Sequence, residues 1–156
     1  VRRDWCRLAR NLQNHILREI LTTGNEKSSL DILKQITEKI KKREINKKQL
    51  IIRTQLKKPL NEYRAVTPHV VAAQKLEKQG IPISQGYLVE YFIAETREKK
   101  ALVRDKVKLP NEKGKYNIEY YLNNQISPAV ENILEVFGIN TKEIIEGKKQ
   151  AKLGEF

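Results

Sequence analysis

The stretch LKKPLNEYRAVTPHVVAAQKL, residues 56–76, is central to the interpretation of the whole chain. Its first part is polar and contains two prolines, which favour an irregular and stiffened backbone. Thr67 and Pro68 have the residue types of a helix cap and a first helical turn. The apolar residues that follow, as far as Gly80, predict a helix. The stretch therefore predicts a basic loop that leads directly into a partly buried helix.

Two amphipathic helices are predicted before this stretch. Asp4 is the expected N-cap of the first, whose apolar residues recur every three to four positions. The second is predicted over residues 28–43, with Ser28 and Asp31 as a capping box. The apolar run Leu50–Ile52 then predicts a short buried strand.

The second half of the chain predicts a small antiparallel sheet and further helices. Residues 87–94 and 101–108 are expected to pair as antiparallel strands across the charged turn 96–100. Asn117 is expected to cap a helix, and Pro128 to open or kink the next one. The predicted class is α+β: mainly helical, with a small antiparallel β-sheet.

Positive charge is concentrated in the first part of the chain. The formal net charge of the 156 residues is +12. Residues 1–64 contain 17 Lys/Arg and 7 Asp/Glu, whereas residues 65–156 contain 14 and 12. Such an asymmetry favours a polyanionic partner for the first part. We therefore assign binding to the basic part and a scaffold role to the near-neutral second part.

The residue types that build catalytic or metal sites do not cluster in this sequence. His15 and His69 are far apart, Cys6 is the only cysteine, and there is no glycine-rich phosphate loop. A lone thiol forms no disulfide within the chain, which fits the reducing cytoplasm. No apolar run is long enough to span a membrane. We expect no catalytic residue, no metal and no membrane contact.

Two groups of residues are candidates for contacts with a polyanion. Arginines recur along one face of the first predicted helix, starting at Arg3 and Arg7, although an exposed face without a ligand explains that spacing equally well. The segment Gln55–His69 mixes lysines, an arginine and neutral donors, which suits sequence-neutral contacts with a duplex. A plain basic loop has the same composition, so both interpretations stay open.

Four blocks of sequence together resemble the thumb segment of archaeal-type family B DNA polymerases. The blocks are VRRDW at 1–5, LKKPLNEYRAVTPHVVAAQKL at 56–76, GYLVEYFI at 86–93 and YNIEYYLNNQISPAVENILEVFG at 116–138. They occur in the family's order and spacing, so the resemblance covers nearly the whole chain. Thr67 is a departure, because many archaeal members have glycine there.

The resemblance implies a non-catalytic part of a DNA-directed DNA polymerase, a nucleotidyltransferase, that grips the primer–template duplex. In this family the palm, with its catalytic aspartates and two metal ions, precedes the stretch that resembles residues 1–5. The implied partners are duplex DNA and the polymerase part that contains the palm and exonuclease. No cofactor is expected in this chain, because magnesium belongs to the catalytic part. The predicted DNA-binding residues are Arg2, Arg3, Arg7, Gln55, Lys57, Lys58, Tyr63, Arg64 and His69.

Several alternatives remain open on the sequence. The chain is either a small subunit of a split polymerase or a fragment of a longer one. A stand-alone basic DNA-binding or clamp-adaptor module would have the same charge. Tyr120 and Tyr121 are either core aromatics or contacts that support the grip, and we favour the core for one of them.

The last residues contain a second motif. Gln150, Leu153 and Phe156 follow the pattern Gln-x-x-aliphatic-x-x-aromatic, which resembles the peptide that docks on a sliding clamp. One helical turn would place Leu153 and Phe156 on the same side, where both enter an apolar pocket, while Gln150 supplies a polar anchor. We therefore predict a thumb domain over residues 1–146 and a clamp-binding tail over residues 147–156.

The tail motif generates a first testable expectation. Phe156→Ala removes the terminal apolar anchor, so it should abolish stimulation of DNA synthesis by the clamp and leave clamp-free synthesis unchanged. Primer extension with and without clamp measures both quantities. A loss of clamp-free synthesis would show instead that the tail packs against the body of the protein.

Overall fold

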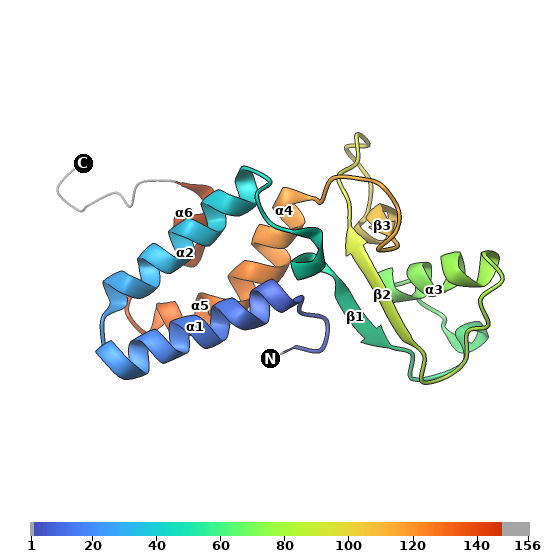
Figure 1. The fold of residues 1–156 in the computed structure, drawn as a ribbon, viewed down its shortest axis with the longest axis horizontal. Coiled ribbons are helices and arrows are strands. Elements are labelled where there is room, and N and C mark those ends of the chain that lie inside the picture. The colour runs from blue at the N-terminus through green and yellow to red at the C-terminus, as the bar shows by residue number, and fades with distance from the viewer. Residues whose placement is uncertain (1, 148–156) are drawn as a thin grey trace. The chain divides into compact units, whose positions relative to one another are not determined.

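The computed structural model describes residues 2–147 and has a mixed helical and β architecture (Figure 1). The helices are α1 (Arg7–Thr23), α2 (Glu26–Lys41), α3 (Pro68–Lys78), α4 (Ile118–Tyr120), α5 (Ser127–Glu135) and α6 (Thr141–Glu146). The strands are β1 (Ile52–Gln55), β2 (Leu88–Ile93) and β3 (Val107–Lys108). The predicted α+β class, with its small antiparallel sheet, is confirmed.

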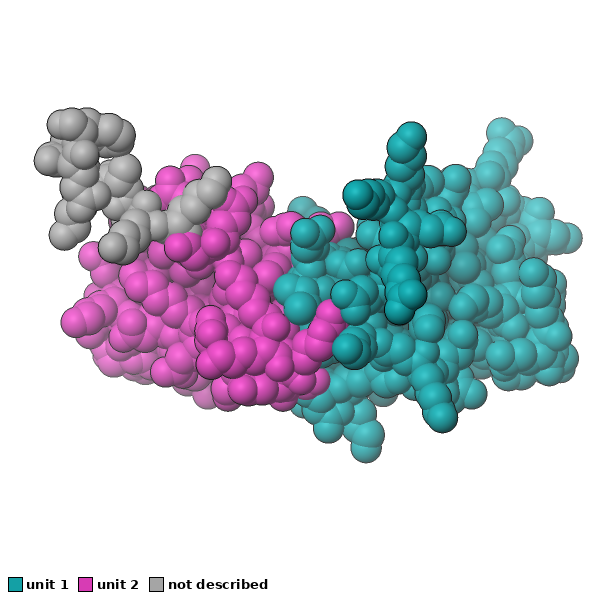
Figure 2. All heavy atoms as spheres, turned by 90° about the horizontal axis from the view of Figure 1, so that it is seen from above, with its two compact units in different colours: residues 1–7, 46–120 teal, residues 8–45, 121–156 magenta. Residues whose placement is uncertain are grey.

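The chain forms two compact units, each built from segments that are distant in sequence (Figure 2). Unit 1 contains the described residues 2–7 and 46–120, and unit 2 contains residues 8–45 and 121–147. The sheet and α3 belong to unit 1. The predicted thumb domain and tail over 1–146 and 147–156 stay a prediction, because the tail lies almost entirely outside the described residues.

The sheet of unit 1 is antiparallel with strand order β1-β2-β3. On one side of β2, Ile52 pairs with Tyr91; on the other, Phe92 pairs with Lys108. Helix α3 packs against β2, as Figure 1 shows, and its Val70 is buried. Both edges and one face of β2 are therefore covered within this unit.

Two strand predictions are wrong in detail. The strand predicted at Leu50–Ile52 begins only at Ile52, because Asn46 caps a 3₁₀ turn over Lys47–Leu50. The sheet was expected within the second half of the chain, but its first strand, β1, comes from the first half. The partner strand predicted over residues 101–108 is reduced to β3, because Val103–Lys106 forms another 3₁₀ turn. Local side-chain caps compete with strand pairing at both places.

Polar contacts fix α3 against the turn that follows β3. The Lys75 ammonium donates to the Val107 carbonyl (2.9 Å) and to Glu112 Oε1 (3.1 Å). Burial alone would raise the pKa of Glu112, but the Leu109 N–H and Lys75 outweigh it and hold this pKa below its ordinary value. Lys47 donates to the Glu112 carbonyl (3.0 Å) and lies over the Phe92 ring. These lysines therefore support the fold of unit 1.

The first two helices of the chain start at different residues from those predicted. Helix α1 begins at Arg7, three residues after the predicted N-cap Asp4, and follows a turn in which the Trp5 N–H donates to the Arg2 carbonyl. Helix α2 begins earlier than expected, because Asn25 Oδ1 accepts the Lys27 N–H (3.0 Å). Asparagine is among the strongest N-caps, so it replaces the predicted capping box at Ser28 and Asp31.

A π-helical segment links α4 to α5 over Tyr121–Ile126. Asn117 Oδ1 accepts the Tyr120 N–H (2.9 Å), as the predicted cap requires. Pro128 is the second residue of α5; its ring lacks an N–H and crowds the carbonyl four residues earlier, which the wider π turn accommodates. Tyr121 is fully buried, so it is the core aromatic of the pair.

Helices α1, α2, α5 and α6 form unit 2 around an apolar core. The core includes Leu12, Ile16, Leu33, Ile40 and Leu134, each at most 3% exposed. Gln13 Nε2 donates to the Ala129 carbonyl (3.0 Å), which joins α1 to α5. Within residues 2–147, no helix is both long and apolar enough to cross a membrane.

One buried and one exposed leucine of unit 2 provide a stability test. Leu33→Ala leaves a cavity in the core and should lower the free energy of unfolding by about 2–5 kcal/mol. Leu21→Ala is the matched control, because Leu21 is 83% exposed and its truncation should cost about 0.5 kcal/mol or less. Chemical denaturation measures both; equal effects would contradict the assigned core.

Candidate nucleic-acid interface

The segment Gln55–His69 lies in unit 1 and connects the end of β1 to the start of α3. Its first residues form hydrogen bonds with the turn before β2. The Leu56 N–H donates to the Tyr87 carbonyl (2.9 Å), and the Gly86 N–H donates to the Leu56 carbonyl (2.7 Å). The Gln55 side chain also donates to the Gly86 carbonyl (3.1 Å). The segment therefore leaves the sheet from a defined position.

Tyr63 organises the middle of the segment. Its hydroxyl oxygen accepts the Lys57 N–H at 3.0 Å, and the Lys58 ammonium lies 4.9 Å from its ring centroid. The ring also meets His69 edge to face, with centroids 5.5 Å apart at 82°. A cation over a ring and an aromatic edge contact are both attractive. Four predicted site residues therefore form one cluster, which we name the Tyr63 cluster: Lys57, Lys58, Tyr63 and His69.

His69 is held in a fixed orientation within this cluster. Its Nδ1 shares a hydrogen bond of 2.9 Å with the Thr67 hydroxyl. Burial lowers the pKa of the imidazole below its ordinary value of 6.5, which favours the neutral ring at pH 7. His69 thus offers a neutral donor or acceptor beside the lysine charges.

Thr67 positions His69, a role that sequence reasoning missed. It is the N-cap residue of α3, with φ −89° and ψ 167°, yet its side chain does not cap the helix. This extended conformation is open to any residue, so threonine in place of glycine causes no backbone strain here. A threonine two residues before a histidine at a helix start was the signal available in the sequence.

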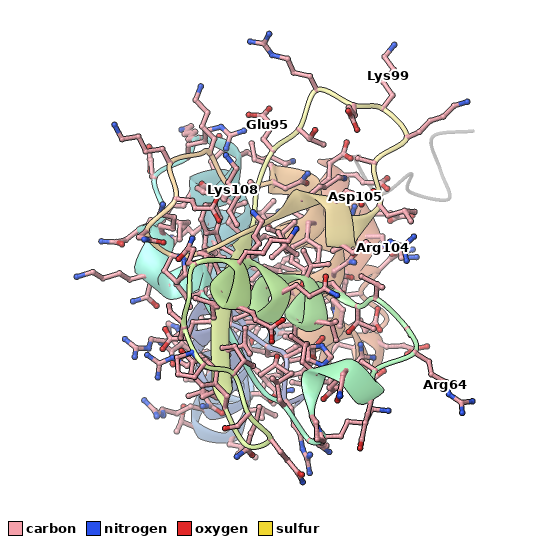
Figure 3. The ribbon with its side chains drawn as sticks, turned by 90° about the vertical axis from the view of Figure 1, so that its right-hand side faces the viewer. Arg64, Glu95, Lys99, Arg104, Asp105 and Lys108 are labelled. Atoms are coloured by element: carbon pink, nitrogen blue, oxygen red, sulfur yellow. The ribbon has the colours of Figure 1, made fainter. Side chains whose placement is uncertain are left out.

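The segment that carries the cluster contains three cations and one carboxylate, that of Glu62, so its net charge is positive. Lys57, Lys58 and Arg64 are exposed, and the first turn of α3 contains no acidic residue. The first N–H groups of a helix have no partner inside it and favour anions. Figure 3 shows the Arg64 side chain extending away from the body of the unit. The arrangement can hold phosphate oxygens through cations and oriented N–H groups together.

The other predicted site residues include three arginines near the N-terminus and Gln55. Arg2 and Arg3 are exposed in the turn before α1, and Arg7 is the first residue of that helix. Gln55 contacts the turn before β2, as described above. The predicted clamp-binding residues Gln150, Leu153 and Phe156 lie outside the residues that the structure describes.

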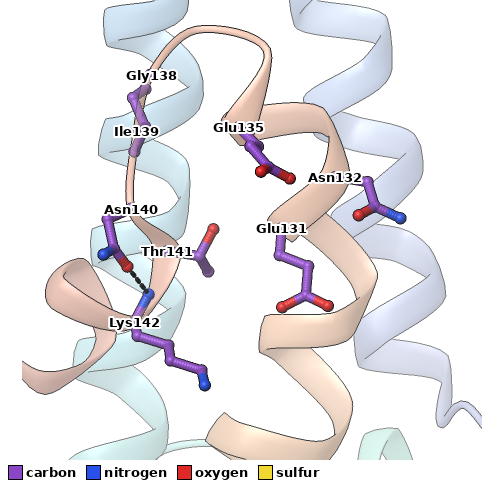
Figure 4. Close-up of a pocket in the computed structure, with 8 residues that line it drawn as sticks. All are labelled: Glu131, Asn132, Glu135, Gly138, Ile139, Asn140, Thr141 and Lys142. Atoms are coloured by element: carbon purple, nitrogen blue, oxygen red, sulfur yellow. Dashed lines mark hydrogen bonds between the residues drawn. The ribbon is translucent and has the colours of Figure 1, made fainter.

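Unit 2 has a polar hollow of about 460 Å³ between the end of α5 and the start of α6 (Figure 4). Glu131 and Glu135 line one side, and Asn140, whose Oδ1 accepts the Lys142 N–H (3.1 Å), lines the other. None of the predicted site residues within residues 2–147 lines this hollow. Among residues 2–147, no three His, Cys, Asp or Glu side chains are arranged to hold a metal ion.

Comparison with known proteins assigns the family. The model of DNA polymerase family B matches residues 1–137, and the chain therefore belongs to this family. It is 37% identical to a DNA polymerase of Pyrococcus horikoshii, over 99% of this chain and 13% of that protein. It is 38% identical to a DNA polymerase of Pyrococcus glycovorans, over 88% of this chain and 18% of that protein.

A solved structure of the family B DNA polymerase from Pyrobaculum calidifontis has a similar fold. The TM-score is 0.73 at 28% sequence identity, over 88% of this chain and 18% of the other. The chain therefore spans less than a fifth of the length of these three proteins.

The hydrogen bond between Tyr63 and the Lys57 backbone generates a local test. Tyr63→Phe keeps the ring contacts but removes the acceptor, so the Lys57 amide should exchange with solvent up to about tenfold faster. Tyr87→Phe, in the same unit, is the control and should leave that amide unchanged. Hydrogen exchange followed by NMR gives both rates; equal rates in the two variants would contradict the cluster.

Proposed function

We propose that this chain is the thumb segment of a DNA-directed DNA polymerase, and that it holds the primer–template duplex without taking part in the chemical step. Membership of DNA polymerase family B supports a nucleic-acid substrate. The observation that carries the proposal is the Tyr63 cluster, which gathers Lys57, Lys58 and His69 beside the N-terminus of α3.

Phosphate contacts supply most of the grip in this proposal. Lys57, Lys58 and Arg64 neutralise backbone phosphates, and each neutralised phosphate releases bound counterions. Such contacts are independent of base sequence, as a replicating enzyme requires. Neutral groups such as Gln55 and His69 suit the minor groove, whose pattern of acceptors is nearly the same for all base pairs. The duplex is therefore held without regard to its sequence.

The chemical step belongs to another part of the polymerase. Catalytic magnesium ions are held by clustered carboxylate ligands. We assign those ions, and the nucleotidyl transfer, to the part that contains the palm and exonuclease. This chain works with that part either as a separate subunit or as a segment of one longer protein.

Two further assignments complete the proposal. Gln150, Leu153 and Phe156 form a peptide that docks on a sliding clamp, as their spacing indicates. A polymerase acts where the replicating DNA lies, so we place the chain in the cytoplasm, at the nucleoid.

The proposal is tested with Lys57→Ala, Lys58→Ala and Arg64→Ala combined. The loss of three phosphate contacts should weaken duplex binding by roughly tenfold or more and shorten processive synthesis. The rate of a single nucleotide addition at saturating DNA should stay the same, because the chemistry lies elsewhere. Processivity assays and rapid-quench kinetics measure the two quantities.

A charge-matched control distinguishes the loss of specific phosphate contacts from a general effect of removing positive charge. Lys27, Lys34 and Lys39 are exposed on α2, so replacing these three by alanine removes the same charge elsewhere. This control should leave processivity near the wild-type level. Equal losses in both triple variants would contradict a localised grip, and a slower single addition at saturating DNA would contradict a purely gripping role.

A further inference from the structure

The near-neutral second part of the chain contains a local excess of positive charge. Residues 95–115 hold eight Lys/Arg and four Asp/Glu, whereas the rest of residues 65–156 hold six and eight. The average over the second part therefore conceals a basic segment, which lies in unit 1 and connects β2 through β3 to the start of α4.

Four exposed side chains define this surface, which we name the β2–β3 loop cations: Arg97, Lys99, Lys100 and Arg104. Among the described residues, no carboxylate forms an ion pair with any of them. Figure 3 shows Lys99 at the outer end of the loop, and Arg104 on the same side of that view as Arg64.

Two of the four acidic residues of the segment, Asp105 and Glu112, accept hydrogen bonds from other groups. Asp105 Oδ2 accepts the Leu102 N–H at 2.9 Å, which closes the 3₁₀ turn after the loop. Glu112 accepts from Lys75 and from the Leu109 N–H, as described above. The Leu102 N–H leaves the exposed Asp105 negatively charged, so the segment offers a ligand a net excess of positive charge, eight cations against four carboxylates.

The loop backbone is ordered by its own hydrogen bonds. The Ala94 N–H donates to the Lys106 carbonyl (2.8 Å) and closes the base of the loop. Nearer the tip, the Glu98 N–H donates to the Thr96 hydroxyl (3.3 Å) and the Ala101 N–H to the Glu98 carbonyl (3.4 Å). Cations presented on an ordered turn lose less conformational entropy when they bind.

Helix α3 links this loop to the proposed grip. It packs against the 3₁₀ turn Leu60–Glu62, within the segment that carries Lys57, Lys58 and Arg64. It also packs against the 3₁₀ turn Val103–Lys106, which contains Arg104. Two basic segments that are far apart in sequence therefore flank one helix of the same unit.

We propose that the β2–β3 loop cations form a second phosphate-contacting surface, which binds the same duplex as the segment Gln55–His69. This inference rests on the proposed function and extends it: unit 1 contacts the duplex backbone from both sides of α3. The second part of the chain is then a binding element as well as a scaffold.

The test measures how duplex binding depends on salt in the assembled polymerase, meaning this chain together with the part that carries the catalytic centre. Arg97→Ala, Lys99→Ala and Lys100→Ala are combined in one variant, and a fluorescent primer–template duplex is the probe. Each lost phosphate contact lowers the slope of log affinity against log salt by about 0.9. We expect the slope to fall by roughly one to two.

Two controls make this result specific. The α2 variant Lys27→Ala, Lys34→Ala, Lys39→Ala removes the same charge and should keep the wild-type slope. The double variant Arg97→Lys, Arg104→Lys keeps the positive charge and should also keep the wild-type slope. A slope for the loop variant that equals that of the α2 variant would overturn the proposal. Circular dichroism of each variant verifies that it is folded.

A combined variant separates this inference from the proposed function. When the loop substitutions are added to Lys57→Ala, Lys58→Ala and Arg64→Ala, the slope should fall further than in either triple variant. If the Lys57 triple variant has a shallow slope and the loop substitutions add nothing, only the further inference fails. If the Lys57 triple variant binds like the wild type, the proposed function fails.

Discussion

Strand β2 is the constraint on which unit 1 depends. Its backbone pairs with β1 on one side and with β3 on the other, while α3 packs against it. Val89, Phe92 and Ile93 are fully buried, so the apolar surface of the unit is organised around this strand. Because β1 and α3 are both fixed to β2, the segment that joins them is held at its two ends. That segment carries the proposed grip.

Holding the segment at both ends lowers the entropic cost of the proposed grip. Long lysine and arginine side chains lose conformational entropy when they bind phosphate, so an ordered backbone reduces the total cost. Tyr63 adds order from within, through Lys57 and His69. A neutral His69 adds hydrogen-bonding capacity without repelling the neighbouring lysine charges. Cations, a neutral ring and a helix N-terminus together form a surface suited to phosphate and groove edges.

The average charge of the second part conceals how its charged side chains are distributed. The second part of the chain is almost neutral in sum, yet some of its carboxylates are hydrogen-bonded within the fold. Glu112 and Asp105 accept hydrogen bonds that build turns, whereas Lys99 and Arg104 are exposed. The charge that a ligand meets is the remainder after exposed carboxylates offset the exposed cations. In unit 1 that remainder is positive on both segments that flank α3.

The sequence by itself determined the α+β class, the helix after Pro68, the position of β2 and the family resemblance, because these depend on local periodicity and on motifs. It also identified Lys57, Lys58, Tyr63 and His69 as candidates. It missed the start of β1 and most of the segment before β3, where side-chain caps formed 3₁₀ turns instead of strand. Only the tertiary structure decided which charges remain exposed and which segments flank α3, because both depend on contacts between residues that are distant in sequence.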